Sequence, residues 1–128
     1  MATNLWPSTS AIGRNSGAME QHHESLVVVE DPLISNLVRA VLRKRGYSVV
    51  LTDPAQVMRL LRGPEKFPGI LVTNSPGSFL EFAGAIRLLY LSSSPDPRIE
   101  ALFPICRVIR KPFAPEELVR KVEELEGL

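Results

Sequence analysis

Short runs of apolar residues alternate along this chain with segments whose apolar residues recur at helical spacing. A run without polar interruptions has no face suited to water, so each run predicts a strand that is covered on both faces. The predicted strands span residues 26–29, 47–51, 70–73, 88–91 and, as a short element, 108–109.

The segments between these runs predict helices. Pro32 suits the first turn of a helix and Gly46 suits the left-handed position after one, so residues 32–45 are predicted to be helical. Asp53 is the predicted cap of a second helix that stops at Gly63. A short helix at 78–85, a turn or two at 97–102 and a strong helix at 115–126 follow. The residues predicted to face the core are Leu33, Leu37, Val38, Val41, Leu42, Val57, Leu60, Leu61, Leu118, Val122 and Leu125.

Strand and helix alternate five times, which predicts an α/β fold: a doubly wound parallel sheet with helices on both faces. Residues 25–128 form the predicted domain. Residues 1–24 are rich in Ser, Asn, Gly and Ala without a sustained period, which is typical of a flexible N-terminal tail or linker. The adjacent His22 and His23 in that tail lack a nearby third ligand, so no metal site is expected there.

Composition narrows the choice of partner and compartment. The chain has 128 residues, 45% hydrophobic and 23% charged, with 15 basic and 14 acidic residues and a net charge of +1. This balance does not favour nucleic acid or an anionic membrane as a partner. The single cysteine, Cys106, excludes an internal disulfide and fits a reducing compartment. With no membrane span or signal peptide in the sequence, we expect a cytoplasmic protein.

Polar residues follow the predicted strands at four places. Glu30 and Asp31 follow the first strand, Asn74 the third, Ser92 the fourth and Lys111 the fifth. The carboxyl ends of parallel strands meet at one edge, where ligands of such sheets bind, so we expect these side chains to converge. Glu30 and Asp31 have an alternative role, because carboxylates also stabilise the N-terminus of a following helix.

The acid pair, the hydroxyl and the sequence Lys111-Pro112-Phe113 together resemble the receiver domain of bacterial two-component response regulators. The resemblance covers about residues 25–126. It implies a flavodoxin-like, five-stranded sheet of order 2-1-3-4-5, here with shortened third and fourth helices. It also implies that Asn74 occupies the position of the phosphate-accepting aspartate.

The resemblance further implies a role for each strand-end residue. Glu30 and Asp31 would hold Mg²⁺ together with the carbonyl group of Pro76, Ser92 would donate a hydrogen bond to a phosphoryl oxygen, and Lys111 would neutralise its charge. The amide of Asn74 is no nucleophile and carries no charge, so we expect neither phosphorylation nor more than weak Mg²⁺ binding. Glu30, Asp31 and Lys111 are then free to form ion pairs with one another.

Two further departures indicate that the activation machinery is lost. Val108 stands where receivers usually carry an aromatic switch residue, and the segment between Asn74 and Ser92 is short for a full third helix. We therefore predict a phosphorylation-independent, non-enzymatic interaction module of a phosphorelay. Its expected partner is a histidine kinase or another signalling protein. The resemblance also allows a homodimer through the fourth helix, fifth strand and fifth helix.

Two alternatives stay open at this point. The first is a working receiver that is phosphorylated at another residue, with Ser75, Asp53 and Asp96 as candidates. The second is a small enzyme on the same frame, since a fold does not determine a function. Residues 25–128 contain no histidine and no glycine-rich phosphate loop, so the sequence offers this enzyme no recognisable catalytic group.

Overall fold

The computed structural model describes residues 25–65, 67 and 69–128. The predicted tail at 1–24, with His22 and His23, lies outside this part of the chain. Within the described part, none of the helices combines the length and apolar character needed to cross a membrane.

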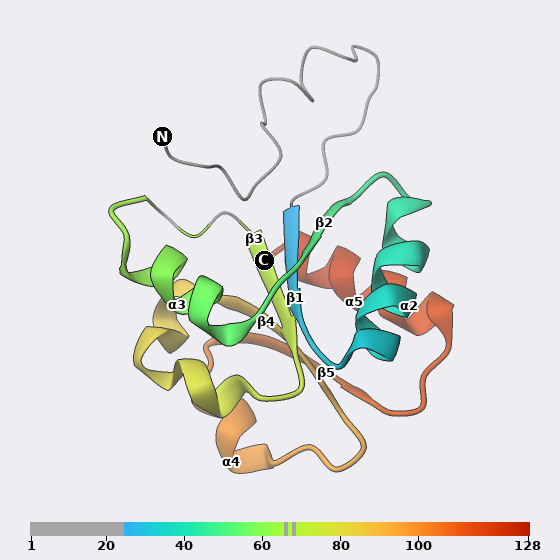
Figure 1. Ribbon diagram of the computed structural model, residues 1–128. Helices are drawn as coiled ribbons and strands as arrows, with labels where there is room; N and C mark the ends of the chain where they lie inside the picture. The colour runs from blue at the N-terminus through green and yellow to red at the C-terminus, as the bar shows by residue number, and fades with distance from the viewer. Residues whose placement is uncertain (1–24, 66, 68) are drawn as a thin grey trace.

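Strands and helices alternate through the described chain as the sequence predicts (Figure 1). The strands are β1 (Ser25–Val29), β2 (Ser48–Leu51), β3 (Gly69–Thr73), β4 (Arg87–Ser92) and β5 (Ile105–Arg110). The helices are α2 (Pro32–Arg43), α3 (Pro54–Arg62), η2 (Pro76–Ala85), α4 (Pro97–Glu100) and α5 (Pro115–Glu126).

All strand pairs are parallel, and the strands form one sheet of order β2-β1-β3-β4-β5. The predicted doubly wound topology is therefore confirmed. In the register, Val29 pairs with Thr73, Thr73 with Tyr90, and Ser92 with Arg110. The residues that follow these positions accordingly emerge at the same edge of the sheet.

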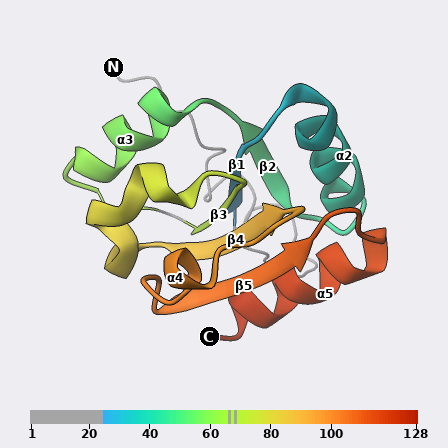
Figure 2. The same ribbon diagram turned by 90° about the horizontal axis from the view of Figure 1, so that it is seen from below.

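Two hydrophobic clusters, one on each face of the sheet, form the core. Figure 2 shows α2 and α5 on one side of the sheet and α3 and α4 on the other. Helices α2 and α5 cover one face, where Val38, Leu42 and Leu118 pack against alternate residues of the central strands. On the other face α3 and η2 contribute Val57 and Phe79, and Phe103 comes from the segment between α4 and β5. Alternate side chains of each strand point to opposite faces of the sheet. Because helices cover both faces, the strands need apolar residues at every position, which explains their uninterrupted apolar runs.

Local signals place the helix ends. Asp31 and Asp53 cap α2 and α3, since their side chains accept hydrogen bonds from the backbone N–H groups of Ile34 at 3.0 Å and Gln56 at 2.9 Å. Gly46 has a φ of 91°, and the N–H groups of Gly46 and Tyr47 donate to the carbonyl groups of Arg43 and Leu42. This arrangement is the left-handed helix ending predicted for Gly46.

The predicted inward face of α2 is partly wrong. Leu33 and Leu37 are 78% and 42% exposed, whereas Val38 and Leu42 are fully buried. A helix turns 100° per residue, so once Val38 and Leu42 face the sheet, Leu37 lies at the border of the buried stripe and Leu33 on the far side. The buried stripe instead includes Ile34 and the polar Ser35.

The third and fourth crossovers are short, as predicted, but the third differs in kind. Residues Pro76–Ala85 form a 3₁₀ helix in which Phe79 and Phe82 have non-helical backbone angles. The α4 helix has only 4 residues. β5 is longer than the predicted 108–109, because it pairs with β4 along its entire length.

Gly69, at the start of β3, is a close-contact position that the sequence pattern did not reveal. A Cβ atom on Gly69 would overlap the carbonyl oxygen of Ser25 and lie 2.9 Å from its carbonyl carbon. Because the obstacle is the backbone of β1, Gly69→Ala is expected to destabilise the fold by about 3 kcal/mol. Thermal unfolding followed by circular dichroism measures this loss.

Gly84→Ala is the matched control for that measurement, since a Cβ atom there meets nothing within 4 Å. Equal melting temperatures for the Gly69 and Gly84 variants would contradict the close approach of β1 and β3.

Candidate functional site

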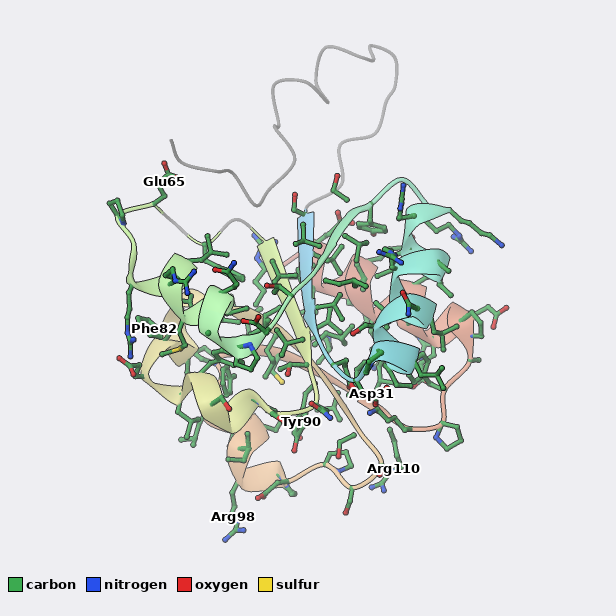
Figure 3. All side chains as sticks on the ribbon, viewed as in Figure 1. Asp31, Glu65, Phe82, Tyr90, Arg98 and Arg110 are labelled. Atoms are coloured by element: carbon green, nitrogen blue, oxygen red, sulfur yellow. The ribbon has the colours of Figure 1, made fainter. Side chains whose placement is uncertain are left out.

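The polar residues predicted to converge do lie at one edge of the sheet. In Figure 3, Asp31 and Arg110 lie at the end of the molecule where β1 and β5 finish, and Glu65 lies at the opposite end. Glu30 and Asn74 follow the paired residues Val29 and Thr73, so they emerge side by side. We call the set Glu30, Asp31, Asn74, Ser92 and Lys111 the strand-end site.

Glu30 is the most enclosed residue of the strand-end site, with a side chain that is 0% exposed. Its Oε1 atom accepts hydrogen bonds from the Lys111 Nζ at 3.3 Å and from the backbone N–H of Asp31 at 3.2 Å. Its Oε2 lies 3.1 Å from the same Nζ, an ion-pair contact without hydrogen-bond geometry. Burial raises the pKa of Glu30, and Lys111 opposes that rise.

Lys111 reaches Glu30 from the far side of the site. It follows β5, and β3 and β4 lie between β5 and β1 in the sheet. The lysine side chain, 21% exposed, therefore extends across the carboxyl ends of the central strands, where Asn74 and Ser92 are located. Its backbone N–H donates to the carbonyl oxygen of Ser92 at 2.9 Å, and the Lys111–Pro112 peptide bond is cis.

Among the described residues, the side chains of Asp31 and Asn74 form hydrogen bonds only with nearby positions of the chain. Asp31 is exposed and caps α2, so the alternative role weighed for it, helix capping, is the one its geometry shows. The Oδ1 atom of Asn74 accepts a hydrogen bond from the Ser75 hydroxyl at 3.1 Å. The N–H of Ser75 in turn donates to the buried Thr73 hydroxyl at 3.1 Å, which holds this turn in place.

Ser92 ends β4 with its hydroxyl turned to its own loop, where it accepts a hydrogen bond from the N–H of Ser94 at 2.9 Å. Arg110 donates from its guanidinium to the carbonyl oxygen of Ser93 at 3.1 Å. The loop after β4 is thus held both from within and from β5.

Two contributors to the site were missed at the sequence level. Ser35 is buried and donates from its hydroxyl to the carbonyl oxygen of Glu30 at 3.1 Å. The sequence held one signal for the burial of Ser35: it lies about one helical turn before Val38, on the same face of α2 as Val38 and Leu42. Arg110 was missed because its only signal was adjacency to Lys111.

Each alternative acceptor already takes part in a hydrogen bond. Asp53 caps α3, outside the strand-end site. Asp96 caps α4, and the Arg98 guanidinium beside it lowers its pKa. Ser75 lies next to Asn74 and donates to it. Ser75 is thus hydrogen-bonded to a residue of the strand-end site.

The strand-end site does not fit the magnesium centre that the resemblance implies. Hard divalent cations take several oxygen ligands, favoured when these are anionic. Here one carboxylate, Glu30, is paired with Lys111, the other, Asp31, caps a helix, and Asn74 is neutral. Across residues 25–65, 67 and 69–128, no group of at least three His, Cys, Asp or Glu side chains is arranged to hold a metal.

The β5 residues Cys106 and Val108 pack rather than react. Both are half-buried against the cluster on the α3 and η2 face. Burial raises the pKa of the Cys106 thiol to about 11, so the thiol stays protonated at neutral pH.

Comparison with solved structures identifies the fold. A response regulator from Thermotoga maritima matches with a TM-score of 0.69 at 16% identity, over 84% of this chain and 100% of that chain. A putative response regulator from Chloroflexus aurantiacus matches with a TM-score of 0.68 at 18% identity, with the same coverage of 84% and 100%. A third match is the receiver domain of a sensor histidine kinase from Pseudomonas aeruginosa, with magnesium coordinated in its active-site cleft. Its TM-score is 0.66 at 19% identity, over 84% of this chain and 100% of that chain.

The sequence comparisons add no closer relative. No protein-family model matches this sequence, and no curated protein matches it significantly. The structural similarity therefore establishes the receiver-domain fold, and the function has to be inferred from the strand-end site.

Proposed function

We propose that this protein is a receiver-like domain of a two-component signalling pathway that acts through protein contacts and without phosphorylation. The observation that supports this proposal is Asn74, which stands at the carboxyl end of β3 between Glu30 and Ser92. A phosphoryl acceptor at this position must be a carboxylate, because its oxygen attacks phosphorus. An uncharged amide oxygen is too weak a nucleophile for that step.

The surroundings of Asn74 support the same proposal. Glu30 and Lys111, which would serve the metal and the phosphoryl group, are paired with each other. Val108 is a packing residue of β5, with no aromatic ring to change position. We assign the domain no enzymatic activity, and expect it to present one constant surface to its partner.

The contact surface stays a prediction from the receiver-like frame. On the face formed by α4, β5 and α5, Arg107 of β5 pairs with Glu124 of α5 at 2.9 Å. Leu102, just after the four-residue α4, is 55% exposed. We expect this face to contact a protein partner, either a signalling protein such as a histidine kinase or a second copy of this chain. A cytoplasmic location likewise remains a prediction.

Incubation with acetyl phosphate and Mg²⁺, followed by intact mass spectrometry, tests the central proposal. The wild-type chain is expected to keep its mass, because it lacks the attacking oxygen. A stoichiometric, alkali-labile phosphoryl adduct on any residue would refute the proposal, and peptide mapping would then decide among Ser75, Asp53 and Asp96.

A further inference from the structure

Given the proposed function, we infer that the Lys111 ammonium is the permanent cation of the strand-end site, in place of a divalent metal, and that it makes the domain independent of Mg²⁺. The observation that supports this inference is the Glu30–Lys111 ion pair, which spans the ends of β3 and β4. Among the described residues, Glu30 and Asp31 have no further His, Cys, Asp or Glu side chain beside them with which to hold a metal.

The first step concerns the charge of Glu30. Its carboxylate is fully enclosed, and an enclosed anion is stable only beside a cation or hydrogen-bond donors. Lys111 supplies both, with its Nζ 3.1 Å from Oε2 and 3.3 Å from Oε1. Within the described chain, Lys111 is the only cation that forms an ion pair with Glu30.

The second step concerns Asn74. A carboxylate at position 74 would lie between Lys111 and Glu30 in the order of the strands, and it would compete for the ammonium. The amide of Asn74 offers no charge, and its Oδ1 already accepts from Ser75. The Lys111 side chain therefore extends beyond the end of β3 and pairs with the buried carboxylate of Glu30.

The third step concerns what is left for a metal. Because Lys111 balances the charge of Glu30, Asp31 is the remaining carboxylate of the site. Asp31 is exposed and accepts a hydrogen bond from the N–H of Ile34. A magnesium ion would have to displace the Lys111 ammonium or bind through a single carboxylate. Mg²⁺ also gives up its water reluctantly, so its affinity for this site should be negligible.

The wild-type protein, stripped with EDTA, provides the first test. Adding millimolar MgCl₂ is expected to leave its melting temperature and the amide NMR signals of Glu30, Asp31 and Lys111 unchanged. Stabilisation by Mg²⁺, with saturable shifts at these residues, would overturn the inference, because a ligand that binds only the folded state raises the melting temperature.

Lys111→Met provides the second test. Removing the ammonium leaves Glu30 enclosed without a counter-ion, so the melting temperature in EDTA is expected to fall by about 10 °C. Mg²⁺ should now recover part of this loss, because Glu30 and Asp31 face no competing cation. In the double variant Glu30→Gln with Lys111→Met, most of the loss should disappear and Mg²⁺ should have no effect.

Lys121→Met is the matched control, because Lys121 is 24% exposed, close to the 21% of Lys111, but lies 4.0 Å from the half-exposed Glu124. It is expected to change the melting temperature little and to stay insensitive to Mg²⁺. A Lys111→Met protein as stable as Lys121→Met would overturn the inference. If Lys111→Met does not fold, the wild-type titration and the recovery of folding in the double variant still decide.

The outcomes separate this inference from the proposed function. A wild-type protein that binds Mg²⁺ yet takes up no phosphoryl group would refute the permanent-cation role and leave the phosphorylation-independent function standing. A wild-type protein that takes up a phosphoryl group would refute the proposed function first.

Discussion

Asn74→Asp is expected to let the protein carry a stoichiometric aspartyl phosphate, which we expect the wild-type protein to lack. The new carboxylate oxygen attacks the phosphorus of acetyl phosphate, a P–O bond forms, and the bond to the acetate oxygen breaks as acetate leaves. The variant also restores a third carboxylate to the strand-end site. With it, Mg²⁺ is expected to bind and to be required for the reaction.

The fold should tolerate this change. Asn and Asp have nearly the same shape, and Asn74 is exposed, so the substitution requires no repacking. Ser92 and Lys111 already lie at the same edge, one on the adjacent strand and one after β5. The introduced carboxylate would compete with Glu30 for the Lys111 ammonium, and so release Glu30 toward the metal.

Intact mass spectrometry with and without EDTA measures the gain. Asn36→Asp is the matched control, because Asn36 is an exposed asparagine of α2 whose side chain accepts a hydrogen bond from the Arg39 guanidinium, away from the strand-end site. The control should stay unmodified. An Asn74→Asp protein that folds, binds Mg²⁺ and still takes up no phosphoryl group would show that the site has lost more than its acceptor.

Phe79→Ala is expected to destabilise the fold more than Gly69→Ala. Phe79 is 0% exposed and is the largest fully buried side chain of the described residues, in the cluster with Val57 and Leu71. Removing an enclosed ring leaves a cavity and costs about 4 kcal/mol. That is a large share of the about 5–15 kcal/mol by which domains are usually stable.

The local structure around Phe79 makes the effect larger than usual. Phe79 lies in η2, a 3₁₀ segment whose backbone departs from helical angles at Phe79 itself. A 3₁₀ helix has poor hydrogen-bond geometry, so we expect burial of the Phe79 ring to contribute much of what holds η2 on the sheet. Local unfolding of η2 should therefore accompany the global loss.

Urea unfolding and amide hydrogen exchange measure the two effects. Leu80→Ala is the neighbouring control, because Leu80 is 39% exposed and should lose far less. If both variants lost the same stability, η2 would not be held by Phe79.

Sequence reasoning predicted most of the fold because the signals it used are local. Apolar runs without a polar side predict strands buried on both faces, and the strands found include every predicted one. Asp53 and Gly46 mark helix ends through bonds to residues a few positions away. Asn74, Ser92 and Lys111 were predicted to share an edge because parallel strands place their carboxyl ends together.

The sequence alone thus determined the order of the elements, the sheet that they form and the neutral residue at the end of β3. Only the tertiary structure decided that Leu33 is on the exposed side of α2 and that η2 is a 3₁₀ helix. It also decided that Lys111 pairs with Glu30, 81 positions away. The reason is physical. A cap or strand pattern depends on neighbours along the chain, whereas the partner of a charge and the exposed side of a helix depend on which distant surfaces pack against them.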